Sequence, residues 1–249
     1  MLNVSNSNAS AFLRRKFMRY FLINERMPLD IQASLSAYGT CIPLPPLASL
    51  PFPVCHHPDM LITEIFGKIF VHREFREGQA ILEHLGVSSC ISEKTVGTRY
   101  PNDISLNCFS VGDVLFAKET AVSGEVLSWA KENGKTVANV NQGYAKCSTV
   151  IAGGRIASAD RSIVKTAQKV NIPALLVPPH PIGIEVYDTG FLGGASLMLD
   201  ESTLGFFGNI ETYPFYAELK AFFAEVGVNL VSLSGEPLFD YGGAIMLEI

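Results

Sequence analysis

Five short polar clusters, spread along the chain, contain the side chains with which it could bind or transform a ligand. Each cluster opens an apolar run of the kind that forms a strand. The candidate ligand-binding residues are His57, Asp59, Asn102, Asp103, Asn107, Gln142, Tyr144, Lys146, Asp188, Asp240 and Tyr241. Several carboxylates and one lysine suit a small polar ligand that is cationic or resembles an amino acid. Asp, Asn and Pro are also common turn residues, so a structural role is the alternative at any one position.

Three residues of these clusters could also take part in a reaction. Cys147 follows Lys146, whose charge could lower the thiol pKa and favour a nucleophile. His57 and Asp59 are the other candidates, because a histidine beside a carboxylate can move protons. A cysteine that only packs as a small apolar side chain is the alternative. Cys55, His56, His57 and Asp59 match no standard zinc signature, so we expect neither a metal nor a cofactor.

The clusters belong to a repeated unit of two strands, an amphipathic helix and a third strand. The units begin near residues 57, 100, 143 and 190, so their starts are 43, 43 and 47 residues apart. In the first unit we expect strands over 60–65, 68–72 and 87–91 and a helix over 75–85. In the second we expect strands over 104–109, 113–117 and 136–140 and a helix over 121–132. The third and fourth units have expected helices over 159–170 and 213–226.

The two ends of the chain supply a fifth unit. A fifth start falls near Tyr241, but only the first strand can follow it. The remainder of that unit is found at the other end of the chain, as a strand over 18–23, a helix over 28–37 and a strand over 40–44. The sequence therefore predicts one α/β domain over residues 1–249, a five-fold pseudo-symmetric ring closed by both termini, with residues 1–16 as a flexible start. A WD40-type propeller has no such helices, and a (β/α)₈ barrel needs eight.

This organisation resembles the pentein fold of guanidine-modifying enzymes, which include arginine and agmatine deiminases and amidinotransferases. The last strand, residues 241–247, is similar to the Gly-Gly-Asn-x-His-Cys strand that carries that family's catalytic cysteine. In this register Leu247 takes the place of the cysteine and Met246 that of the histidine. The resemblance thus implies the family's architecture without its nucleophile.

A second segment resembles the part of those enzymes that supplies the general base. Residues 188–193 are similar to the Gly-His-x-Asp segment, with Phe191 and Gly193 in place of the histidine and the carboxylate. The motifs HPDM at 57–60, YPND at 100–103, QGYAKC at 142–147 and DYGG at 240–243 more closely resemble an uncharacterised bacterial family of the same fold. The resemblance implies a degenerate active site, because the reaction needs both a thiolate and a proton shuttle.

Composition argues against several classes of function. The chain has 249 residues and a net charge of −5, which argues against nucleic-acid binding. Five scattered cysteines without a CxxC pair and the lack of an export or membrane segment predict a cytoplasmic protein that does not bind membranes. We expect a small polar metabolite to bind at the axial mouth of the ring, without cysteine-dependent guanidine chemistry. The alternative is a hydrolase or transferase for a guanidine or amidine substrate that uses Cys147, or His57 with Asp59.

Overall fold

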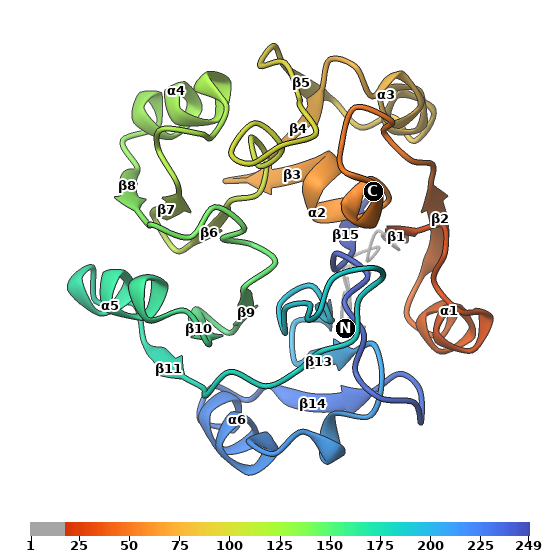
Figure 1. The fold of residues 1–249 in the computed structure, drawn as a ribbon, viewed down its shortest axis with the longest axis vertical. Coiled ribbons are helices and arrows are strands. Elements are labelled where there is room, and N and C mark those ends of the chain that lie inside the picture. Colours follow the sequence, from red (N-terminus) through yellow and green to blue (C-terminus); the bar gives the residue numbers. More distant parts are fainter. Residues whose placement is uncertain (1–17) are drawn as a thin grey trace, which may run out of the picture.

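The ring contains five small three-stranded sheets around a common axis, with one longer helix of each unit on the outside (Figure 1). The computed structural model describes residues 18–249, so the expected flexible start at residues 1–16 lies outside the described part. In each sheet the inner strand is antiparallel to the middle strand, which is parallel to the outer strand. The inner strands belong to five separate sheets and do not form one closed barrel.

Each sheet takes one strand of each kind. The inner strands are β15 (Ile245–Glu248), β3 (Ile62–Ile65), β6 (Phe109–Val111), β9 (Thr149–Ala152) and β12 (Ser196–Asp200). The middle strands are β1 (Arg19–Asn24), β4 (Lys68–His72), β7 (Val114–Ala117), β10 (Arg155–Ser158) and β13 (Thr203–Phe206). The outer strands are β2 (Thr40–Leu44), β5 (Ser89–Ser92), β8 (Thr136–Asn139), β11 (Ala174–Leu176) and β14 (Asn229–Ser232).

A helix connects the middle strand of every sheet to its outer strand, as the parallel pairing of these two strands requires. These helices are α1 (Leu29–Ser36), α3 (Arg76–His84), α4 (Gly124–Glu132), α5 (Arg161–Lys169) and α6 (Tyr216–Ala224). Three shorter helices, η1 (Phe52–Val54), α2 (Pro58–Leu61) and η2 (Ile210–Thr212), lie in connections. No helix within residues 18–249 is long and apolar enough to cross a membrane.

Helix α5 illustrates why these segments are helical. Asp160 caps its N-terminus, and one carboxylate oxygen accepts hydrogen bonds from the backbone N–H groups of Ser162 and Ile163. Ile163 and Ala167, four residues apart, are fully buried against the neighbouring strands. Local capping and one apolar face therefore suffice to place this helix on the outside of its sheet.

The fifth sheet closes the ring with both ends of the chain. Strand β15 pairs antiparallel with β1, with Leu247 opposite Tyr20 and Ile245 opposite Leu22. Beyond these pairs, Met18 and Ile249 exchange two backbone hydrogen bonds. The predicted five-unit α/β ring, with its fifth unit built from both termini, is confirmed.

The polar clusters lie on turns before the inner strands. The sequence had instead placed these clusters at the starts of the strands. Asp59 and Met60 were expected in a strand over 60–65 or at its start, but they form the helical turn α2, which begins at Pro58. Proline fits the first helical position because it needs no intrahelical N–H partner there. Asn107 lies in a turn before β6, where its N–H donates to the carbonyl of Ile104. These turns hold the polar side chains at one end of the inner strands.

Candidate functional site

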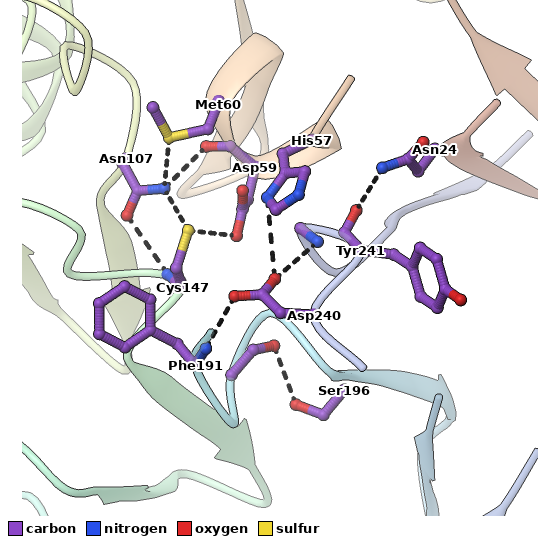
Figure 2. A network of polar contacts seen from close by, with 12 residues as sticks. Asn24, His57, Asp59, Met60, Asn107, Cys147, Phe191, Ser196, Asp240 and Tyr241 are labelled. Atoms are coloured by element: carbon purple, nitrogen blue, oxygen red, sulfur yellow. Dashed lines mark hydrogen bonds and ion pairs between the residues drawn. The ribbon is translucent and has the colours of Figure 1, made fainter. Parts of the chain in front are cut away.

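A network of buried polar side chains occupies the centre of the ring (Figure 2). The thiol of Cys147 donates to Oδ2 of Asp59 across 2.9 Å. The amide Nδ2 of Asn107 donates to the same sulfur, also across 2.9 Å. The three residues come from three different units of the ring and are each at most 2% exposed. The sulfur therefore lies between an acceptor and a donor that only the tertiary structure brings together.

Asn107 holds this arrangement in place. Its Oδ1 accepts hydrogen bonds from the backbone N–H groups of Lys146 and Cys147, at 2.8 and 3.3 Å. Its Nδ2 also lies 3.3 Å from the carbonyl oxygen of Asp59. One amide thus connects the turn before β6 to the turns before β3 and β9, which fixes the position of the thiol.

Asp240 is the second buried carboxylate of the network. Its Oδ2 accepts a hydrogen bond from the N–H of Phe191 at 2.8 Å, and its Oδ1 accepts one from the N–H of Gly242 at 2.9 Å. A Cβ on Gly194 would lie 2.0 Å from Oδ1, so only glycine fits beside the carboxylate. The Nδ1 atom of His57 lies 3.7 Å from Oδ1 of Asp240, in the same buried region.

Burial controls the protonation of these groups. It raises the pKa of Asp59 to about 7, with a further contribution from the Asp240 charge, and it raises the pKa of Asp240 to about 6. Burial also raises the pKa of Cys147 well above its ordinary value, so the sulfur is a thiol at neutral pH. The pKa of His57 falls to about 3, again by burial, which makes its ring neutral at physiological pH.

Two cavities reach this network. The first, the mouth cavity, has a volume of about 390 Å³ and is lined by Val54, His57, Tyr144, Cys147, Ile184, Tyr187, Asp188, Thr189, Phe191 and Asp240. The second, the axial cavity, has a volume of about 230 Å³ and is lined by the inner strands of all five sheets together with Asp59 and Lys146. The mouth cavity is formed mainly by the loops, whereas the axial cavity follows the centre of the ring.

The structure divides the sequence-predicted residues between these places. His57, Tyr144, Asp188 and Asp240 line the mouth cavity together with Cys147. Asp59 and Lys146 were expected at the mouth, but they line the axial cavity. Asn107 forms hydrogen bonds to the backbone of both Asp59 and Lys146 and so lies between these two residues. Asp103 is 1% exposed and accepts a hydrogen bond from the Tyr144 hydroxyl at 2.6 Å.

Three predicted residues lie away from both cavities. Asn102 is exposed, on the turn beside Asp103. The Gln142 amide lies 3.3 Å from the Asp160 carboxylate and lines a separate small cavity. The side chain of Tyr241 points away from Asp240 in Figure 2 and packs against the Phe239 ring, with the two planes inclined by 32°.

Sequence reasoning missed part of the mouth cavity. Tyr187 and Phe191 contribute aromatic rings, and the Phe191 ring lies 6.0 Å from that of Tyr144. The position of Tyr187 beside Asp188 could have placed it there, and Phe191 takes the place of the general-base histidine in the segment that resembles guanidine-modifying enzymes. Residues 18–249 contain no group of three or more His, Cys, Asp or Glu side chains placed to hold a metal ion.

Comparisons with known proteins agree with this architecture. A family model described as a family of unknown function (DUF6873) matches residues 22–245. Among solved structures, a DDAH from Pseudomonas aeruginosa in complex with citrulline is similar, with a TM-score of 0.52 and 10% identity over 94% of this chain and 99% of that chain. No curated protein matches the sequence.

An amidinotransferase from Microseira wollei, of the saxitoxin biosynthetic pathway, is also similar. It has a TM-score of 0.50 and 12% identity, and the match covers 86% of this chain and 76% of that chain. A dimethylarginine dimethylaminohydrolase adduct with S-methyl-L-thiocitrulline has a TM-score of 0.53 and 10% identity over 94% of this chain and all of that chain. At such low identity these likenesses concern the fold, which is the pentein fold expected from the sequence.

Proposed function

The chain belongs to this family of unknown function, and we propose that it binds a small ligand with a cationic head group in the mouth cavity. The main support for this proposal is the composition of the cavity lining. The described lining of the cavity combines the carboxylates of Asp188 and Asp240 with three aromatic rings and includes no lysine or arginine. A cavity of this composition favours a positive charge over a neutral or negative one.

The aromatic rings give the cation a second kind of contact. Tyr144 and Phe191 lie against each other, with ring centroids 6.0 Å apart and planes inclined by 31°. Tyr187 adds a further, half-exposed ring. A cation within about 6 Å of a ring centroid is attracted by the ring's electron-rich face, which is worth about 0.5–2 kcal/mol. A planar guanidinium group could stack on a ring while it pairs with a carboxylate.

Asp240 supplies the buried charge in this proposal. Because its pKa is raised to about 6, the carboxyl is protonated in acid and ionised above that value. The bound cation would favour the ionised form. Affinity should therefore rise as the pH increases through about 6 and change little above about 7. His57, neutral throughout this range, would add no opposing charge.

The structural neighbours support a guanidine or amidine head group. The names of two similar proteins refer to dimethylarginine and to amidino transfer, which both involve a guanidine or amidine group. Asp240 and Cys147 of this chain line the mouth cavity. We therefore choose arginine and agmatine as probes, with citrulline as a neutral control of similar length.

Thermal-shift titration of the full chain tests the proposal. Arginine or agmatine should raise the melting temperature at pH 7.5, and citrulline should not. A hundredfold excess of ligand over its dissociation constant adds about 2.7 kcal/mol of stability. Asp240→Asn should remove the shift, whereas Asp113→Asn, in an exposed turn, should keep it. Equal shifts with citrulline, or an unchanged shift in Asp240→Asn, would contradict the proposal.

A hydrolase or transferase that uses Cys147 is the second candidate, and the hydrogen bond between its thiol and Asp59 favours it. Asp59, with a pKa of about 7, could accept the thiol proton as the sulfur attacks an amidine carbon. Incubation with arginine or agmatine and analysis for citrulline-type or ammonia products distinguishes an enzyme from a binding protein. Turnover that disappears in Cys147→Ser would establish the enzyme. Ligand that stays unchanged while bound would support binding alone.

A further inference from the structure

The axial cavity contains a single amine in a largely apolar lining. Lys146 enters it beside Asp59, and most of the remaining lining consists of aliphatic, aromatic and thioether side chains from the inner strands, such as Ile151, Leu197 and Met246. Among residues 18–249, no atom forms a hydrogen bond or ion pair with Nζ of Lys146, although its backbone N–H is held by Asn107. The residue is only partly buried, so this amine is accessible to a ligand that enters the cavity.

The surroundings of Lys146 shift its protonation equilibrium toward the neutral amine. Burial lowers its pKa, while the nearby Asp59, Cys147 and Asp240 act in the opposite direction without cancelling the effect. Glu64 also lines the cavity, but its side chain is exposed. An uncharged lysine is a nucleophile toward carbonyl carbons, whereas a protonated one is not.

Asp59 provides the second group that carbonyl chemistry needs. It is 2% exposed, lines the same cavity, and its Oδ1 has no hydrogen-bond partner within residues 18–249. Its other oxygen, Oδ2, accepts the thiol hydrogen bond of Cys147. A carboxyl group with a pKa of about 7 can give up a proton and take it back near neutral pH.

We propose that Lys146 forms an imine with a small aliphatic aldehyde that enters the axial cavity, and that Asp59 supplies the proton for the loss of water. The volume of about 230 Å³ admits only a small compound, and the largely apolar lining favours an aliphatic one. This site differs from the mouth cavity, since the residues that line the two cavities do not overlap. The inference is therefore independent of the cation proposed for the mouth.

The reaction balances without an oxidant or reductant. The lone pair of Nζ attacks the aldehyde carbon, a C–N bond forms, and a proton moves from nitrogen to the former carbonyl oxygen to give a carbinolamine. The neutral Asp59 carboxyl then protonates the hydroxyl group, the C–O bond breaks and water leaves. The products are a protonated imine on Lys146 and an Asp59 carboxylate, whose opposite charges attract each other.

Reductive trapping tests the proposal on the full chain. The protein is incubated near neutral pH with a limiting amount of butanal and sodium cyanoborohydride, which reduces an imine to a stable butylamine. Peptide mapping by mass spectrometry then gives the labelling rate of each lysine. Because its lowered pKa raises the fraction of neutral amine, Lys146 should be labelled faster than the exposed Lys131 and Lys220.

Three variants complete the test, and circular dichroism verifies that each is folded. Lys146→Arg should remove the fast label, while Lys220→Arg, on the surface of α6, should keep it. Asp59→Asn should slow the labelling of Lys146 at least about tenfold and leave Lys131 unchanged. Labelling of wild-type Lys146 at the rate of the exposed lysines would overturn the proposal. An unchanged rate in Asp59→Asn would overturn the role of Asp59.

Discussion

Replacing Asp59 by asparagine should stabilise the fold increasingly as the pH rises. Burial and the Asp240 charge raise the pKa of Asp59 from 3.8 to about 7 in the folded chain, whereas an unfolded chain restores the ordinary value. The folded state thus holds the proton more tightly. The resulting contribution to stability is complete below about pH 4 and is lost as the pH rises through about 7. Asparagine does not ionise, so the Asp59→Asn variant has no corresponding loss of folding stability over this pH range.

The size of the effect follows from the shift. A pKa difference of about three units corresponds to about 4 kcal/mol, because each unit is worth about 1.4 kcal/mol. The asparagine amide oxygen can accept the Cys147 thiol hydrogen bond in place of Oδ2. Its NH₂ group then occupies the position of Oδ1, which has no partner within residues 18–249. We expect asparagine to gain about 2–4 kcal/mol relative to aspartate between pH 4 and pH 7.5.

Urea denaturation at several pH values between about 4 and about 7.5 measures this difference. Wild-type protein is compared with Asp59→Asn and with the surface control Asp113→Asn, whose unfolding free energy should follow that of the wild type. A stability difference between wild type and Asp59→Asn that stays constant with pH would refute the raised pKa. A difference that grows in the wild type's favour would mean that Asp59 is ionised and stabilised by a partner.

Three further changes test the ring and its turns. Deletion of residues 241–249 removes β15 from the sheet that closes the ring, so the shortened chain should lose its cooperative thermal transition, and an unchanged melting temperature would contradict ring closure. Gly242→Ala should cost about 2–4 kcal/mol in urea denaturation, since φ is +77° and the new Cβ would lie 2.3 Å from Cβ of His57. A cost below about 0.5 kcal/mol would show that the turn adapts. Asp160→Ala removes the cap of α5 and should cost about 1 kcal/mol, whereas Asp160→Asn should retain most of the wild-type stability.

The sequence by itself determined the architecture of this protein. Strands β2 and β4 have the predicted bounds, 40–44 and 68–72, and each predicted helix is present with its ends within three residues of the predicted ones. The reason is that helices and strands are specified by local signals, which are the apolar periodicity, the capping residues and the glycine turns. Each signal depends on about ten neighbouring residues, and the same pattern occurs five times. The two half-units at the chain ends then leave only one way to complete the ring. The sequence pattern did not reveal the geometry of the turns. Asp59 and Met60 were therefore expected in a strand or at its start, although they lie in α2.

Only the tertiary structure decided which polar side chains meet and which way they face. Lys146 and Cys147 are neighbours in the sequence, yet one lines the axial cavity and the other the mouth cavity. Asp240 is buried in the network while the adjacent Tyr241 points away from it (Figure 2). Such directions depend on the φ and ψ angles of single turn residues, and a rotation at one turn sends a side chain to the other face. The burial that shifts the pKa of Asp59 likewise exists only once five distant turns have packed together.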